Sequence, residues 1–234
     1  MNGVLAQIQL RERSGSSCVA DNGFCPDWIA DNFDRYLGPL VDHVILTVIS
    51  VGIGFTIATA LALLAHRRRW LTGPITGITG VLYTVPSLAA FFLLQPITGR
   101  GNLTAVVALV AYTLLIIFRN VATGLDNVPE ETKDAARGMG LTERQLLFRV
   151  ELPLAVPEIM AGLRIATTTT IGLATLAFFA GGDGLGQFFS SGAQREFRSN
   201  VAVAGGLAVL LAAVFDLLIL SVQRLVTPWR RAAA

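Results

Sequence analysis

The chain has 234 residues, of which 53% are hydrophobic and 15% are charged, and its formal net charge is only +2. A mean hydropathy of +0.61 is too high for an ordinary soluble domain, and nothing in the composition points to nucleic-acid binding. The apolar runs are long and do not alternate, so they favour helices over the strands of a membrane barrel. The sequence therefore predicts an all-α, polytopic membrane protein.

Five apolar runs are long enough to cross a bilayer as helices. The predicted spans cover residues 44–65, 75–97, 103–124, 159–180 and 201–222. Pro86 lies in the middle of the second run, where we expect it to kink the helix, with neighbouring groups satisfying the carbonyl that it frees. An odd number of spans places the two termini on opposite sides of the membrane.

The remaining segments divide the chain into an N-terminal segment (1–39), a membrane domain (40–226) interrupted by a polar island (126–157), and a C-terminal tail (227–234). Twelve of the 18 basic residues fall on the side that holds the run Arg67-Arg68-Arg69, the island and the tail. Basic residues accumulate on the cytoplasmic side of membrane proteins. The distribution predicts an N-terminus outside and a C-terminus inside the cell.

This topology places Cys18 and Cys25 in an oxidising compartment, where a short-loop disulfide can form. Two cysteines permit a single intramolecular pairing. The alternative is a pair of free thiols in an unstructured tail.

Local signals in the polar island predict two short helices. Pro129 followed by two glutamates is typical of a helix start, and Gly138 and Gly140 follow it as helix breakers. Thr142 and Gln145 have the spacing of a capping box, which predicts a second helix with Leu146, Leu147 and Val150 on one face. We expect Leu152-Pro153 to end that helix.

The island also carries the pattern Asp134-Ala135-Ala136, then Gly140, then Val150-Glu151-Leu152-Pro153. The two alanines offer little side chain, so the backbone of a partner protein can approach closely there. The alternative is a solvated helical hairpin that contacts nothing, because charged amphipathic helices are common.

This spacing resembles the EAA loop of ABC-importer permeases, in which Glu-Ala-Ala, a glycine and an Ile-x-Leu-Pro ending recur at fixed distances. Asp134 stands in place of the usual Glu, and Val150 in place of the usual Ile. The resemblance implies a type I importer permease fold in which the loop seats in a cleft of the ATP-binding subunit. It assigns the coupling role to residues matched by position: Asp134, Ala135, Ala136, Gly140, Val150, Leu152 and Pro153.

Two further segments resemble permeases for the osmoprotectants glycine betaine, carnitine and choline. The segment 83–89 is similar to their T-I-P-S-L-A sequence, and the segment 181–186 to their glycine-rich loop. Proline is another solute of the same kind, and permeases for methionine and other small solutes share variants of both segments. The resemblance implies two ATP-binding subunits, a second permease copy or paralogue, and an extracytoplasmic solute-binding protein as partners.

Candidates for the translocation path are Tyr83, Pro86, Thr168 and Asp216. A quaternary ammonium solute is best held by aromatic faces, and further aromatic candidates are Phe91, Phe92, Tyr112, Phe178 and Phe179. The alternative is that these rings face lipid or pack in the core.

The polar candidates within the membrane have alternatives of their own. A charged residue within a membrane helix is a functional candidate by default, and Asp216 is the clearest case. The alternatives are an ion pair with Arg119, an ion pair with Arg164, or a position facing a water-filled cavity. For Arg164 itself we favour a side chain that extends to the cytoplasmic boundary. The hydroxyls of residues 167–170 can line a path or bond the carbonyl one turn back.

The sequence holds nothing that predicts an enzyme or a metal site. Lys133 is the sole lysine and lies outside any phosphate-binding glycine loop, so we expect ATP and Mg²⁺ to be bound by a partner subunit and no cofactor by this chain. A rival from another class is a secondary carrier driven by an ion gradient, with Asp216 as its coupling residue.

Overall fold

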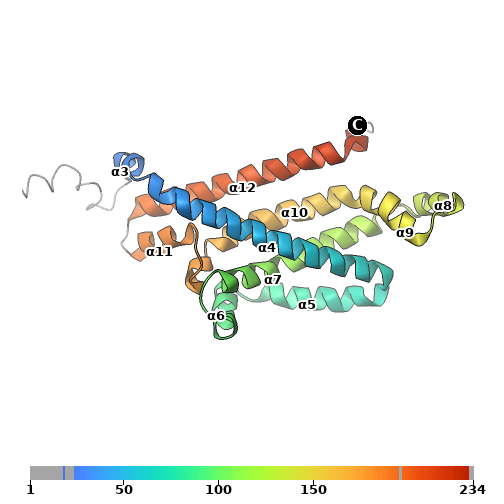
Figure 1. The fold of residues 1–234 in the computed structure, drawn as a ribbon, viewed down its shortest axis with the longest axis horizontal. Coiled ribbons are helices and arrows are strands. Elements are labelled where there is room, and N and C mark those ends of the chain that lie inside the picture. Colours follow the sequence, from blue (N-terminus) through green and yellow to red (C-terminus); the bar gives the residue numbers. More distant parts are fainter. Residues whose placement is uncertain (1–17, 19–23, 195–196, 232–234) are drawn as a thin grey trace, which may run out of the picture.

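The computed structural model describes residues 18, 24–194 and 197–231, and within these residues the regular structure is helical throughout (Figure 1). The long helices are α4 (Asp34–Arg67), α5 (Thr72–Thr84), α6 (Ser87–Thr98), α7 (Asn102–Asp126), α10 (Leu152–Ala174) and α12 (Arg198–Val226). The shorter ones are α3 (Pro26–Asp31), α8 (Glu130–Gly138), α9 (Glu143–Leu146), α11 (Gly186–Gln194), the 3-10 turns η1 (Arg69–Leu71), η3 (Ala177–Ala180) and η4 (Pro228–Arg231), and the π-helix η2 (Leu147–Glu151).

Among the described residues, α4, α7 and α12 are long and apolar enough to span a bilayer, and the bent pair α5–α6 could add a fourth span. Helix α10 occupies the fourth predicted span and is long enough to cross, but Glu158, Arg164 and the threonines at 167–170 interrupt its apolar residues. Helix α4 begins at Asp34, well before the expected start of the first span at residue 44. Helix α11, between α10 and α12, has no counterpart in the sequence-based prediction.

Small residues let α4, α7 and α10 pack closely. Ala58, Ala62 and Ala65 lie on one face of α4 and are buried against α7 and α10. A Cβ added at Gly54 would lie 1.8 Å from Thr113 Oγ1, so only glycine fits where α4 crosses α7. Because lipid is as apolar as a leucine side chain, such close contact is what stabilises helix association in a membrane.

The expectation of a kinked second span is wrong, because the chain breaks there completely. Helices α5 and α6 meet at an angle of 99°. Pro86 caps the start of α6 with extended backbone, and the Tyr112 hydroxyl donates to the carbonyl of Val85 at the break. A side chain of α7 thus satisfies the carbonyl that the helix leaves free, which makes a sharp break tolerable inside a bundle.

The two ends of the bundle have different contents (Figure 1). Helices α8 and α9 lie at the same end as the C-terminal end of α12, whereas α3, α11 and the first turns of α4 and α12 lie at the other. At that second end, Trp28 packs edge-on against Phe197 at 4.7 Å between ring centroids, and Tyr36 packs against Phe188 at 4.4 Å. We call these four rings the aromatic cluster.

A disulfide and hydrogen bonds add to the aromatic cluster at the same end of the bundle, which we call the aromatic end. Cys18 and Cys25 are joined in a disulfide with their Cα atoms 5.8 Å apart. The Tyr36 hydroxyl donates to Asn200 Oδ1 at 2.7 Å, which ties α4 to α12. His43 is fully buried; its Nε2 donates to the carbonyl of Ile171 at 3.0 Å, so α4 is also tied to α10.

Candidate functional site

The polar island forms a hairpin of α8, α9 and η2, residues 130–151, at the C-terminal end of the bundle. Pro129 caps α8 and two acidic residues follow in its first turn, as the sequence predicts. Gly140 has a φ of +82°, the left-handed conformation that ends helices. The N–H of Leu141 donates back to the carbonyl of Ala136 at 3.2 Å, which closes the turn.

The second arm begins as expected but does not end as expected. The capping box is confirmed, since Thr142 and Gln145 exchange side-chain to backbone hydrogen bonds. The prediction that Leu152-Pro153 ends the helix is wrong: α9 runs through the π-helix η2 directly into α10. In a regular helix the ring of Pro153 would clash with the carbonyl four residues earlier, and the wider π turn before it accommodates the ring.

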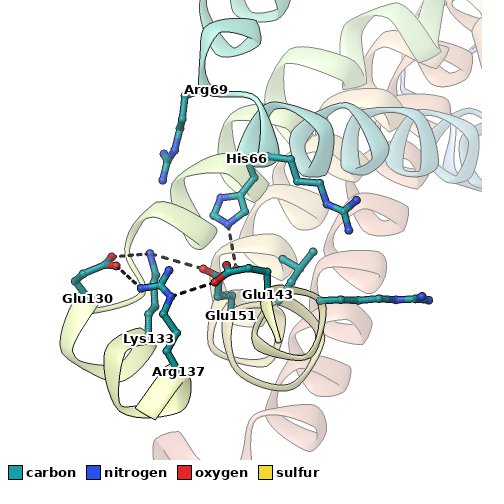
Figure 2. A pocket seen from close by; sticks show the side chains of 10 residues that line it. His66, Arg69, Glu130, Lys133, Arg137, Glu143 and Glu151 are labelled. Carbon is teal, nitrogen blue, oxygen red and sulfur yellow. Dashed lines mark hydrogen bonds and ion pairs between the residues drawn. The ribbon is translucent and has the colours of Figure 1, made fainter. Parts of the chain in front are cut away.

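Two buried ionisable side chains and the partly buried His66 connect the hairpin to α4 (Figure 2). Glu151 is 5% exposed, and its Oε2 accepts from His66 Nε2 at 3.0 Å. The other oxygen of Glu151 lies 3.8 Å from Nζ of Lys133, which is also 5% exposed and comes from α8. Glu151 therefore joins both arms of the hairpin to the last turn of α4, an arrangement that no local sequence pattern reveals.

A second layer of ion pairs lies outside this buried group. Arg137 donates to Glu130 and Asp134 at 3.0 Å each and to Glu143 at 3.3 Å. The hydrogen bond to Glu130, followed by those to Asp134 and Glu143, raises the pKa of Arg137 above its ordinary value. Hydrogen bonds from Arg137 and Lys133 lower the pKa of Glu130. These pairs are exposed, so each contributes little to stability by itself.

A cavity of about 420 Å³ lies between the hairpin and the end of α4, and Figure 2 shows the side chains that surround it. Its lining residues are His66, Arg67, Arg69, Glu130, Lys133, Arg137, Glu143, Arg144, Leu147 and Glu151. The lining carries both signs of charge, most of them already paired across the hairpin. In the described part of the chain no group of His, Cys, Asp or Glu is arranged to hold a metal ion.

The predicted coupling residues separate into a surface set and a supporting set. Asp134, Ala135 and Gly140 are exposed on the hairpin. Ala136, by contrast, is only 2% exposed, so it packs inside the hairpin and cannot itself be the point of close approach. Val150, Leu152 and Pro153 are half-buried where the hairpin joins α10.

Two exposed apolar side chains on the hairpin were missed by sequence reasoning. Met139 is 74% exposed and Phe148 is 53% exposed, on opposite arms. Exposed apolar side chains are typical of surfaces that contact other proteins when they form a patch, so these two are candidates for such a contact. Both residues lie between the alanine pair and the Leu-Pro ending in the sequence, and this position could have identified them as candidates.

The polar path candidates lie on different helices. Arg164 on α10 holds Asp216 on α12 through two hydrogen bonds of 2.7 Å, so of the alternatives left open by the sequence Arg164 is the partner of Asp216. Thr168 bonds the carbonyl of Arg164 one turn back at 3.0 Å. Tyr83 lies at the α5–α6 break and packs against Tyr112.

The structure also separates the aromatic candidates. Phe91 is fully buried in the core beside α7. Phe92, Phe178 and Phe179 instead line one cavity between α6 and η3. Pro86 lies at the break between α5 and α6, where it caps the start of α6.

Comparison with known proteins identifies the family to which this chain belongs. Residues 50–232 match the family described as "Binding-protein-dependent transport system inner membrane component". The chain belongs to this family. Within it, the chain is 37% identical over 202 residues to the choline transport system permease protein OpuBB of Bacillus subtilis (strain 168), covering 86% of this chain and 93% of that protein. It is 38% identical over 207 residues to the osmoprotectant import permease protein OsmW of Salmonella typhimurium, covering 86% and 96%.

Solved structures of the same kind share the fold. A chain from the methionine ABC transporter MetNI in an inward-facing form superposes with a TM-score of 0.70 at 21% identity, covering 87% of this chain and all of that chain. A chain from an amino acid ABC transporter crystallised with histidines gives 0.71 at 16% identity, covering 84% and 96%. The chain therefore has the all-α fold of ABC-importer permeases, as the sequence predicts.

Proposed function

We propose that this chain is the membrane subunit of an ATP-driven importer for a small osmoprotectant such as glycine betaine, carnitine, choline or proline. The chain would move the solute by alternating access, and a separate ATPase would supply the energy through the 130–151 hairpin. The chain itself would be no enzyme and would bind no cofactor, with ATP and Mg²⁺ held by the partner.

The observation that carries the coupling role is the construction of the hairpin. Its inner side is fixed to α4 by the buried group around Glu151, and its second arm continues into α10 without a break. Its outer side presents Ala135, Met139, Gly140 and Phe148 to the surroundings. A force applied by a partner on that surface would reach both membrane helices through rigid contacts.

A second copy or a paralogue would complete the path. The Arg164–Asp216 pair is about 30% exposed on a single chain, although charged pairs at membrane depth face protein or water. Helix α12 leaves large apolar residues such as Val209 and Leu217 exposed, and these would meet lipid or the second copy. The full assembly would hold two permease chains, two ATPases inside, and a solute-binding protein outside, where the N-terminus would lie.

The names of the two relatives support an osmoprotectant as the solute, since they specify choline transport and osmoprotectant import. The alternatives are an importer of the same family for another small solute, such as an amino acid, and an ion-coupled secondary carrier. These differ in energy source and in solute, so one reconstituted assay separates them.

The test is uptake into proteoliposomes that hold the permease, its ATPase and its solute-binding protein. We expect labelled glycine betaine or choline to accumulate only with internal ATP and to be insensitive to an uncoupler. Accumulation that needs no ATP but collapses with the uncoupler would establish the carrier instead. ATP-driven uptake of an amino acid alone would move the chain to the other solute class.

A single substitution tests the hairpin within the same assay. Phe148→Asp should abolish uptake and co-purification of the ATPase, because it places a charge at the proposed apolar contact. Trp70→Asp is the matched control: Trp70 is 69% exposed at the same end of the bundle but lies in η1, outside the hairpin. Equal loss in both variants would mean that the hairpin has no special role.

A further inference from the structure

We propose that the cavity between α6 and η3 binds a zwitterion that combines a quaternary ammonium group with a carboxylate. This inference rests on the proposed osmoprotectant function and adds a binding site on the permease itself. The cavity measures about 410 Å³, within the usual range for small-molecule sites. Its lining side chains are Phe92, Arg100, Phe178, Phe179, Asp183 and Gln187.

The aromatic side of the cavity suits a cation that cannot donate hydrogen bonds. Phe178 and Phe179 pack edge to face with centroids 5.7 Å apart, and the centroid of Phe92 lies 6.4 Å from that of Phe179. Phe92 and Phe179 are 53% and 39% exposed, so their faces are accessible. A methylated ammonium is attracted to such faces by the ring quadrupole, whereas water and ordinary ammonium groups prefer hydrogen-bonding partners.

The other side of the cavity offers a free cation. Arg100, in the turn between α6 and α7, is exposed and makes no hydrogen bond or ion pair with any residue that the structure describes. A guanidinium with unused donors recognises a carboxylate through two parallel hydrogen bonds. Aromatic faces and a free guanidinium in one small cavity match the two ends of a betaine.

The walls of this cavity are held in place before any ligand arrives. Asn102 and Asp183 exchange two hydrogen bonds of 2.8 Å, and Gly101 N–H donates to the carbonyl of Ala180 at 2.8 Å. Gln95 on α6 donates to the carbonyl of Phe179 at 3.0 Å. The turn that carries Arg100 is thereby fixed to the segment that carries the rings, and a site fixed in this way loses little entropy on binding.

The position of the cavity suggests when the solute occupies it. Helices α6 and α11 lie toward the end of the bundle away from the hairpin (Figure 1), which is the outer end in the proposed topology. The solute would thus occupy the cavity as it leaves the binding protein and before it crosses the membrane.

The experiment measures equilibrium binding of radiolabelled glycine betaine and choline to the permease–ATPase complex in nanodiscs, without the binding protein. Arg100→Gln should weaken glycine betaine about tenfold and leave choline, which lacks the carboxylate, within about twofold. Phe179→Leu keeps apolar volume but removes the ring, and should weaken both ligands roughly two- to fivefold.

The controls are Arg198→Gln and Phe24→Leu, which change exposed residues at the same end of the bundle but outside the cavity lining. Both should bind like the unaltered complex. The inference is overturned if the unaltered complex binds neither ligand while the full assembly still imports glycine betaine, or if Arg100→Gln weakens both ligands equally. If the full assembly imports neither solute with ATP, the proposed function itself fails, which is a different result.

Discussion

The two ends of this helix bundle are held together by opposite kinds of interaction. At the hairpin end, the contacts between elements are ion pairs, with Glu151 in a buried inner layer and Arg137 in an exposed outer layer. At the other end, the contacts are packed aromatic rings, a disulfide and neutral hydrogen bonds such as that from Tyr36 to Asn200.

The difference follows from what each end has to do. An end that docks a soluble ATPase benefits from charges, because they keep the surface soluble and orient the partner. The aromatic end joins the start of α4 to the start of α12, and neutral contacts of this kind do not weaken as salt rises. The comparison predicts that the hairpin end is sensitive to charge removal and that the aromatic end is sensitive to loss of its covalent and apolar contacts.

The largest effect should come from the buried layer at the hairpin end. Glu151→Ala leaves the buried Lys133 with the exposed Glu130, 3.4 Å away, as its remaining partner and removes the acceptor of His66, so we expect the hairpin to lose up to about 3 kcal/mol of local stability. ATP-coupled uptake should fall at least about tenfold in consequence. Hydrogen exchange across residues 130–151 and uptake into proteoliposomes measure the two effects.

The matched control is Glu143→Ala, which removes a glutamate from the same hairpin. Glu143 is 79% exposed in its side chain and, among the residues that the structure describes, pairs with Arg137 alone, so its loss should cost about 0–1 kcal/mol. If both variants behave alike, the distinction between an inner and an outer layer is wrong.

The next effect concerns the aromatic end. Cys18→Ser removes the disulfide with Cys25, which closes a loop of sequence separation 7. For so short a loop the chain-entropy account gives about 2 kcal/mol, confined to the N-terminal region. Faster proteolysis near α3 with unchanged ATP-coupled uptake is the expected outcome, and a reducing agent added to the unaltered protein should reproduce it. A loss of uptake would show that the two ends communicate.

A smaller effect should arise from the turn that joins the arms of the hairpin. Gly140 has a positive φ and open space around it, so Gly140→Ala introduces backbone strain of about 1 kcal/mol without a clash. Gly138 also has open space but lies in the last turn of α8, where alanine should stabilise by about 0.5 kcal/mol. Hydrogen exchange of α8 in the two variants should shift in opposite directions, and a shift in the same direction would refute the left-handed cap as its cause.

Local features of the hairpin could be predicted from sequence because their causes are neighbours in the chain. The capping box of Thr142 and the break at Gly140 depend on residues a few positions away. The Glu151–His66 contact joins positions 85 residues apart, and the Tyr36–Asn200 contact joins positions 164 apart. No periodicity or motif encodes such pairs, so only the folded structure reveals them.

Pro86 and Pro153 also show that the effect of a residue on the fold cannot be predicted from its neighbours in the sequence alone. Pro86 was expected to kink a span and Pro153 to end a helix, yet Pro86 breaks its span completely while Pro153 is passed by a continuous helix. A proline removes one donor and crowds one carbonyl in every case. The outcome depends on the surroundings: at Pro86 the Tyr112 hydroxyl satisfies the free carbonyl of Val85 and the chain breaks, whereas before Pro153 the helix widens and continues.

The smallest effect should come from Asp134, where this chain departs from the glutamate of the loop that it resembles. Asp134 is exposed and pairs with Arg137 at 3.0 Å one turn away, and a glutamate at that position can make the same ion pair. Asp134→Glu should therefore leave ATP-coupled uptake within about twofold, since exposed pairs of this kind contribute at most about 0.5 kcal/mol. Asp134→Lys is the informative companion, because it sets two cations side by side next to the proposed ATPase contact and should reduce uptake clearly more. If the glutamate variant instead changes uptake strongly, the carboxylate itself contacts the ATPase, and its reach, not its charge, is what the hairpin end requires.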